Sequence, residues 1–401
     1  MTIRRILWLG PLLLASLWGS SAPASLLRRL GEHIQQFQER SGLGLSLGPS
    51  PVAFPKEGWL QQPLDPFNAS DRRFFLQRYW VNDQHRASQD GPVFLLLGGE
   101  GSLGPGSVMR GHPATLAPVW GALVISLEHR FYGLSIPAGG LDMAQLRFLS
   151  SRHALADVIS ARLTLSRLFN VSSSSPWICF GGSYAGSLAA WARLKFPHLI
   201  FASVASSAPV RAVLDFSEYN NCRAAASAAF AEVKRRLRAG GAAQAALRAE
   251  LGACGSLGRS EDQAELLGTL QALVGGAVQY DGQLPALPSQ LDLCEQVFGL
   301  STSSIAKAVA QTNSYYGGQT PGATQVLFVN GDTDPWHVLS VTQALGPSEA
   351  VLLIPNASHC LDMAPERPSD PPSLLLARQN IFQQLQTWLQ LAKESQVRSG
   401  V

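Results

Sequence analysis

The chain has 401 residues, of which 46% are apolar and 15% charged, and its formal net charge is +3. This composition supplies a large core and excludes a mainly disordered chain. Lys and Arg form no run that interleaves with aromatic residues, which argues against nucleic acid as a partner.

The first 24 residues have the order of a secretory signal peptide. Two arginines precede an apolar run at residues 6–18, and a small-residue sequence follows at 22–24. The run is shorter than the roughly 20 apolar residues of a transmembrane helix. We therefore expect residues 1–24 to be removed before Ser25, and the mature chain to have no integral membrane segment.

The cysteines and glycosylation sequons fit an exported chain. The number of cysteines is five, so at least one is free or pairs between chains. Their spacing matches no zinc motif, and no phosphate-binding motif occurs, so neither a metal nor a cofactor is predicted. Sequons at Asn68, Asn170 and Asn356 are candidate glycosylation sites. The cysteines are Cys179, Cys222, Cys254, Cys294 and Cys360.

The elements follow an alternating order. Residues 25–65 form an N-terminal segment that begins helical and becomes Gly/Pro-rich. Beyond it, continuous apolar runs predict parallel strands that are buried on both faces, with amphipathic helical patterns between several of them. This order indicates an α/β core, built from residues 66–210 and 322–401. The predicted strands are 92–97, 122–127, 177–180, 200–205, 326–329 and 351–354, and the helices are 152–169, 186–196 and 374–392.

Residues 211–321 interrupt the alternation. They contain no convincing core strand, but have helical patterns at 222–253 and 262–274 between Pro-punctuated loops. We expect a helical cap that is inserted between two strands of the core and covers the site beneath it.

One serine lies in the setting that a nucleophile requires. A serine hydroxyl is a poor nucleophile without a neighbouring base, and α/β-hydrolases place it on a sharp strand-to-helix turn flanked by small residues. Three sequences fit G-x-S-x-[G or A], centred on Ser46, Ser183 and Ser348. Only Ser183 follows a predicted strand and precedes a predicted helix, so Ser183 is the candidate nucleophile.

The same fold predicts an acid and then a histidine further along the chain. His359 follows the last predicted strand and is the candidate base. Asp332 and Asp334 follow the strand at 326–329, and either could orient the histidine. The backbone N–H of Tyr184 is one expected oxyanion donor, and Gly99, in the glycine-rich turn after 92–97, is the other.

Several motifs together resemble the serine carboxypeptidase-like family that contains lysosomal Pro-X carboxypeptidase and dipeptidyl peptidase II. The resemblance implies an α/β-hydrolase core with a mostly parallel sheet and a helical cap. It selects Asp334 as the triad acid, because the family pattern is Asn-Gly-x-x-Asp-Pro-Trp, and leaves His359 as the base. The motifs are Tyr79–Asn82, Gly98–Gly101, Glu128–Gly133, Gly181–Gly186, Ser206–Pro209 and Asn330–Trp336.

The resemblance also implies a serine peptidase that hydrolyses short peptides by an acyl-enzyme mechanism, often beside proline. It implies the secretory pathway with an endosomal, lysosomal or cytoplasmic-vesicle site and, for one member, thymic peptide processing and T-cell selection. Trp336 would line the substrate pocket. Ser187 stands where the Pro-X carboxypeptidase has a bulky methionine, which puts proline specificity in question.

Four further expectations remain open. The cap is shorter than in the family, with segments missing after Asn220 and around Gly282, so a catalytically impaired splice form that binds peptides or proteins is an alternative. An esterase or lipase on the same fold is a weaker one. The sequence leaves an oligomer open, and it suggests an ion pair between Glu128 and Arg130.

Overall fold

The computed structural model describes residues 55–214, 216, 224–250, 257–259, 263, 266, 299–344, 346 and 349–398. The expected signal peptide, most of the N-terminal segment and a large part of the expected cap lie outside these residues. So do Cys222, Cys254 and Cys294, together with the helical pattern at 262–274 except for residues 263 and 266.

The described core is an eight-stranded sheet in the order β1-β2-β4-β3-β5-β6-β7-β8. The six strands from β4 to β8 in this order are parallel, and β1 and β2 join them as an antiparallel pair at one edge. The strands are β1 (Lys56–Pro63), β2 (Phe74–Asn82), β3 (Val93–Leu97), β4 (Leu123–Leu127), β5 (Trp177–Gly182), β6 (Ala202–Ser206), β7 (Val326–Gly331) and β8 (Glu349–Ile354).

Each of the six predicted apolar runs forms one of the parallel strands. The three predicted helices also form, as α5 (Ser151–Leu168), α6 (Tyr184–Lys195) and α12 (Pro372–Arg398). A further helix, α3 (Gly111–Trp120), precedes β4 and was not predicted. This arrangement confirms the expected α/β core.

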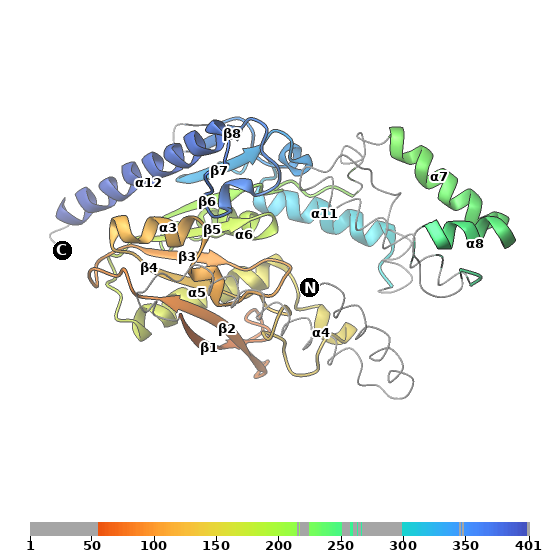
Figure 1. The fold of residues 1–401 in the computed structure, drawn as a ribbon. Helices are drawn as coiled ribbons and strands as arrows, with labels where there is room; N and C mark the ends of the chain where they lie inside the picture. Colours follow the sequence, from red (N-terminus) through yellow and green to blue (C-terminus); the bar gives the residue numbers. More distant parts are fainter. Residues whose placement is uncertain are drawn as a thin grey trace, which may run out of the picture.

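Helices cover both faces of the sheet, and successive strand residues point to opposite faces. Leu95 packs in one apolar cluster with residues of α5 and α6. Its neighbour Phe94 packs in the other, with residues of α3 and α12. Burial on both faces explains why the central strands are apolar throughout. Figure 1 shows α12 lying along the end of the sheet that carries β7 and β8.

The core begins earlier than residue 66. All eight residues of β1 pair with β2, in a register from Lys56 opposite Val81 to Pro63 opposite Phe74. The proposed boundary between residues 65 and 66 therefore falls between two paired strands. β1 was missed because an edge strand exposed on one face alternates polar and apolar residues, and its sequence KEGWLQQP contains no continuous apolar run.

The expected insertion is not uniform in the part that the structure describes. α7 (Ala224–Ala239) and α8 (Gly241–Glu250) pack on each other, and Figure 1 shows them beyond α11 and away from the sheet. α11 (Thr302–Tyr316) instead contacts the core, because Tyr316 stacks on Trp191 of α6 with 3.9 Å between ring centroids. Within the described residues, no helix combines the length and apolarity that a membrane span requires.

Candidate active site

Ser183 occupies a sharp turn between β5 and α6. Its backbone angles are φ 56° and ψ −131°, a region that residues with a side chain rarely adopt. The turn depends on glycine at Gly181, where a Cβ atom would lie 2.1 Å from the Ala185 carbonyl oxygen. Two hydrogen bonds hold the turn, from Ser183 N–H to the Ser206 carbonyl (2.9 Å) and from Ser187 N–H to the Ser183 carbonyl (3.1 Å).

Asp334 and His359 form a buried pair at the ends of neighbouring strands. Both carboxylate oxygens of Asp334 lie 3.0 Å from His359 Nδ1, and the two side chains are 0% and 2% exposed. Because a carboxylate only accepts, Nδ1 carries the proton and donates it. Nε2 is then the nitrogen that can take a proton from a substrate-facing hydroxyl.

The loop that carries His359 packs directly against the turn that carries Ser183. A Cβ atom added at Gly182 would lie 2.9 Å from Cys360 Sγ. The N–H of Cys360 also donates to Ser207 Oγ over 2.9 Å, just beyond the end of β6. Thus the residues next to Ser183 and His359 along the chain are in contact, at the carboxyl ends of the parallel strands.

Asp332, the other candidate acid, has a different environment. It is exposed, and its Oδ1 accepts a hydrogen bond of 2.6 Å from the backbone N–H of Asn356. It therefore stabilises the adjoining loop, whereas Asp334 alone holds the histidine.

The backbone at Gly99 lies close to the start of α6. Tyr184 is the first residue of α6, so its N–H has no acceptor within the helix. A Cβ atom added at Gly99 would lie 3.4 Å from the nitrogen of Ala185, so the Gly99 backbone lies beside the start of α6. The preceding Gly98 N–H already donates to the Leu127 carbonyl (2.9 Å). Gly99 is thus well placed to supply a second donor.

The two expected pocket residues differ in accessibility. Trp336 is half-buried, and its ring centroid lies 6.4 Å from that of His359 and 5.3 Å from that of Phe216. Ser187 is only 1% exposed within α6. Trp336 presents surface beside the histidine, and Ser187 is covered in this structure.

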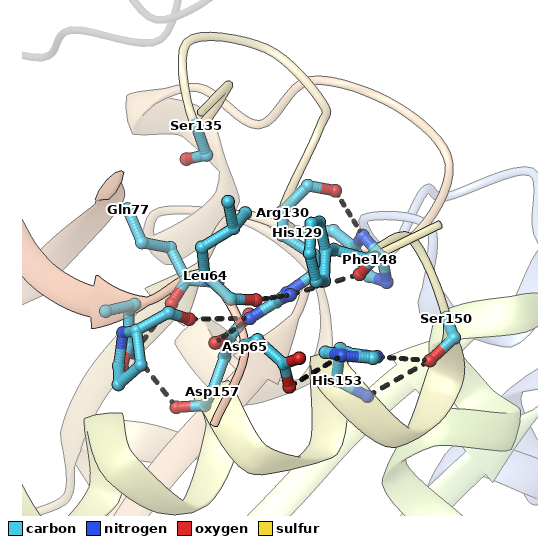
Figure 2. A network of polar contacts seen from close by, with 12 residues as sticks. Leu64, Asp65, Gln77, His129, Arg130, Ser135, Phe148, Ser150, His153 and Asp157 are labelled. Atoms are coloured by element: carbon cyan, nitrogen blue, oxygen red, sulfur yellow. Dashed lines mark hydrogen bonds and ion pairs between the residues drawn. The ribbon is translucent and has the colours of Figure 1, made fainter. Parts of the chain in front are cut away.

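The expected ion pair between Glu128 and Arg130 is wrong. Both side chains are fully buried, but Glu128 pairs with Arg78 (2.9 Å) and Arg130 with Asp157 (2.6 Å). The side chains of residues i and i+2 point to the same face only within a continuous strand. Because the chain turns after β4, the side chains of Glu128 and Arg130 point to different partners. Figure 2 shows Arg130 between Asp157 of α5 and the backbone carbonyls of Leu64 and Phe148.

His129, which sequence reasoning did not assign to the site, contacts the first residue after the candidate nucleophile. Its Nε2 is 3.1 Å from the Tyr184 hydroxyl. The only sequence feature that pointed to His129 was its place between Glu128 and Arg130 in a family motif. Its contact with Tyr184, 55 residues further along the chain, produces no periodic pattern from which it could be predicted.

The remaining predicted positions lie on the surface. The side chains of Asn68, Asn170 and Asn356 are all exposed, as glycosylation requires.

A cavity of about 550 Å³ lies at the loop between β1 and β2, and none of its lining residues belongs to the candidate site. Among the described residues, no three His, Cys, Asp or Glu side chains form a group that could hold a metal ion.

A mostly parallel sheet with a strained serine after β5 and a buried Asp–His pair after β7 and β8 defines an α/β-hydrolase. The chain is a serine-type hydrolase of this fold. A model of the family described as serine carboxypeptidase S28 matches residues 62–289 and 282–381, and the chain belongs to this family.

Three curated relatives show how far the similarity extends. The thymus-specific serine protease of Homo sapiens is 66% identical, with 98% of this chain and 99% of the relative covered. The Mus musculus protein of the same name is 62% identical, with 97% and 99% covered. The lysosomal Pro-X carboxypeptidase of Homo sapiens is 32% identical over 52% of this chain and 41% of the relative.

The alignments also locate a difference in length. The alignment with the human thymus-specific protein spans 507 positions, whereas this chain has 401 residues, so the chain has gaps relative to that protein. The family match falls into two segments that meet at residues 282–289, inside the expected cap.

Proposed function

We propose that Ser183, His359 and Asp334 form the catalytic triad of a serine peptidase that cleaves peptides through an acyl-enzyme. The bond from His359 Nδ1 to both oxygens of Asp334, 3.0 Å each and fully buried, carries this proposal. The strained turn at Ser183, packed against the same loop, supports it.

The chemistry follows from the groups present. Ser183 Oγ bonds to the carbonyl carbon of the scissile peptide as His359 Nε2 takes the hydroxyl proton. The N–H groups of Tyr184 and Gly99 bind the resulting oxyanion. The intermediate expels the amine, which receives the proton from His359. Water then attacks the acyl carbon by the same proton route, releasing the acid and restoring Ser183.

We propose that Trp336 forms a wall of the substrate pocket. Its ring lies beside His359 and retains accessible surface. The apolar ring of proline packs well on an indole face, which fits the name of one relative, lysosomal Pro-X carboxypeptidase. Comparison of peptides with Pro or Ala next to the scissile bond tests this: Trp336→Ala should remove any preference for Pro.

Related peptidases such as lysosomal Pro-X carboxypeptidase suggest a lysosomal or secretory route. We propose an endosomal, lysosomal or other vesicular site for the glycosylated protein, and a role in thymic peptide processing and T-cell selection. The identity to relatives named for the thymus supports this role. Loss of the protein should change the peptides presented by thymic cells, and an unchanged peptide repertoire would contradict the role.

A fluorophosphonate probe tests the triad directly, because it phosphonylates only an activated serine. The folded protein should be labelled, and Ser183→Ala should abolish both labelling and peptide turnover. Ser173→Ala is the matched control, because Ser173 is an exposed serine outside the site. Equal labelling of the Ser183→Ala variant would refute the assignment.

A second function has its own observation. The gaps relative to the human relative, and the two family-model segments that meet inside the expected cap, support a catalytically impaired peptide- or protein-binding form. This form would bind peptides equally well with Ser183→Ala and show no turnover by the parent protein. An acyl-ester panel run beside the peptides separates an esterase or lipase from a peptidase.

A further inference from the structure

His129 is the second residue after β4 and is only 4% exposed. Its Nδ1 is 2.7 Å from the Arg130 carbonyl oxygen. A carbonyl oxygen only accepts, so Nδ1 carries the proton and Nε2 is an acceptor. The hydroxyl of Tyr184, 3.1 Å away, therefore donates to Nε2. This bond connects the end of β4 to the first residue of α6.

The residue before His129 anchors the backbone on one side. Glu128 Oε1 accepts hydrogen bonds from Arg78 (2.9 Å) and from the N–H of Leu103 (3.1 Å). Its Oε2 accepts from Ser135 Oγ over 2.7 Å. Because Glu128 is completely buried, these charge-assisted bonds are not weakened by competing water.

The residue after His129 anchors the backbone on the other side. Arg130 donates to both carboxylate oxygens of Asp157, at 2.6 and 2.7 Å, and to the carbonyls of Leu64 and Phe148 at 3.0 Å each. Figure 2 shows this guanidinium surrounded by its acceptors. With both neighbours fixed, the imidazole of His129 has little freedom to move.

The glycine-rich loop after β3 is tied to the same short segment. Gly98 N–H donates to the Leu127 carbonyl over 2.9 Å, and a Cβ atom at Gly98 would lie 2.9 Å from the nitrogen of His129. Further along the loop, Leu103 donates to Glu128. Gly99 lies between these two attachments.

We propose that Glu128, His129 and Arg130 act together as a positioning device for the oxyanion hole, with His129 holding Tyr184 and Glu128 holding the loop that carries Gly99. The inference rests on the proposed function, since it assigns a task to residues that would act through the two donor groups. None of the three is a catalytic residue, because none touches the reacting atoms.

Such a device is needed because the turn is strained. The direction of the Tyr184 N–H depends on ψ of Ser183, which is −131° at a φ of 56°, and a strained conformation persists only when its surroundings over-determine it. The bond from Tyr184 to His129 adds a restraint immediately after the strained residue. Burial lowers the pKa of His129 to about 4, so the ring stays a neutral acceptor under mildly acidic conditions.

Paired substitutions test the proposal. His129→Phe and Tyr184→Phe should each lower kcat by at least about 10-fold and leave KM within about twofold. The loss in kcat should stay smaller than the ~10²–10³-fold loss that follows deletion of an oxyanion donor itself. The double variant should have the same kcat as either single variant, because each of the three variants lacks the same hydrogen bond between Tyr184 and His129. His129→Gln, whose amide oxygen can accept, should recover part of kcat. His85→Phe, which changes a histidine outside the site, is the control.

Two measurements keep the outcomes distinct. If fluorophosphonate labels the parent protein but both single variants keep the parent kcat, or if their effects multiply in the double variant, the positioning role is wrong. If the parent is not labelled at all, the proposed function fails first. Melting temperatures accompany each variant, and Tyr184→Phe, which removes one oxygen atom, carries the test should His129→Phe not fold.

Discussion

The two aspartates in the loop after β7 contact different partners, and this difference separates their roles. Asp334 holds His359 with both oxygens, whereas Asp332 accepts from the backbone of Asn356 at the surface. Asp334→Asn should lower kcat about 10³–10⁴-fold, because an amide can impose the wrong tautomer on His359. Asp332→Asn should change kcat less than about twofold. Steady-state kinetics of both variants on one peptide decides, and equal losses would contradict the assignment.

A second prediction at this scale concerns pH. The pKa of His129 is about 6.5 in an unfolded chain and is lowered to about 4 by burial in the folded protein. The unfolded state thus binds the extra proton first, and stability that is complete above pH 6.5 is lost as pH falls towards 4. The groups facing the ring are Arg130, Tyr132 and Tyr184.

For a pKa shift of this size, protonation of His129 at low pH lowers the free energy of unfolding by roughly 3 kcal/mol. His129→Gln does not titrate, so its melting temperature should fall less than that of the parent between pH 7 and pH 4.5. The acidic groups elsewhere are common to both proteins and cancel in this comparison. Parallel pH dependence in the two proteins would show that His129 is not kept neutral by the fold.

Sequence reasoning found Ser183 and His359 because each follows a strand and the fold prescribes their order. The same reasoning left Asp332 and Asp334 open, and only the family resemblance selected Asp334. Sequence reasoning did not find the partners of Glu128, His129 and Arg130. Those partners come from β2, α6 and α5, and which of them meets a given side chain depends on packing in three dimensions. A charged pair two residues apart carries no such information.

Among the elements, α5 is attached to the β1–β2 edge of the sheet through one buried ion pair. Asp157 of α5 accepts two hydrogen bonds from Arg130, whose guanidinium also donates to the carbonyls of Pro63 and Leu64 at the end of β1. Asp157→Asn would leave a buried positive charge without its counter-ion, at a cost of about 3–5 kcal/mol. Chemical denaturation measures it.

The control for this pair is Asp83→Asn. Asp83 pairs with Lys56, but the two side chains are 44% and 64% exposed. Surface pairs contribute about 0–1 kcal/mol, so this variant should unfold almost like the parent. Equal destabilisation by the two substitutions would show that burial does not govern the strength of these pairs.

The parallel strands were predictable from sequence, and the antiparallel strands β1 and β2 were not. Strands covered by helices on both faces must be apolar at every position, and that pattern is distinctive. β1 is largely exposed on one face. β2 begins with alternating exposure, with Phe74 55% and Leu76 53% accessible, and continues with buried residues that include the polar Gln77 and Arg78. The pairing of β1 with β2 depends on the register of two segments, which one segment alone cannot reveal.

At the scale of the whole molecule, the three sequons lie far apart in the chain and all at the surface. Asn68 follows β1, Asn170 follows α5 and Asn356 follows β8. Each Asn→Gln substitution should remove one glycan from protein secreted by mammalian cells, a step that mass spectrometry before and after enzymatic deglycosylation resolves. A substitution that leaves the mass of attached carbohydrate unchanged would mark its sequon as unused.

The unusual backbone of Ser183 has a consequence for how this molecule can evolve and be engineered. A residue with φ 56° and ψ −131° is held in a conformation that glycine accepts without penalty. Ser183→Gly should therefore melt at a higher temperature than Ser183→Ala, although both lack the hydroxyl. The fold would therefore tolerate loss of the hydroxyl, and only selection for turnover would keep a serine in this strained turn.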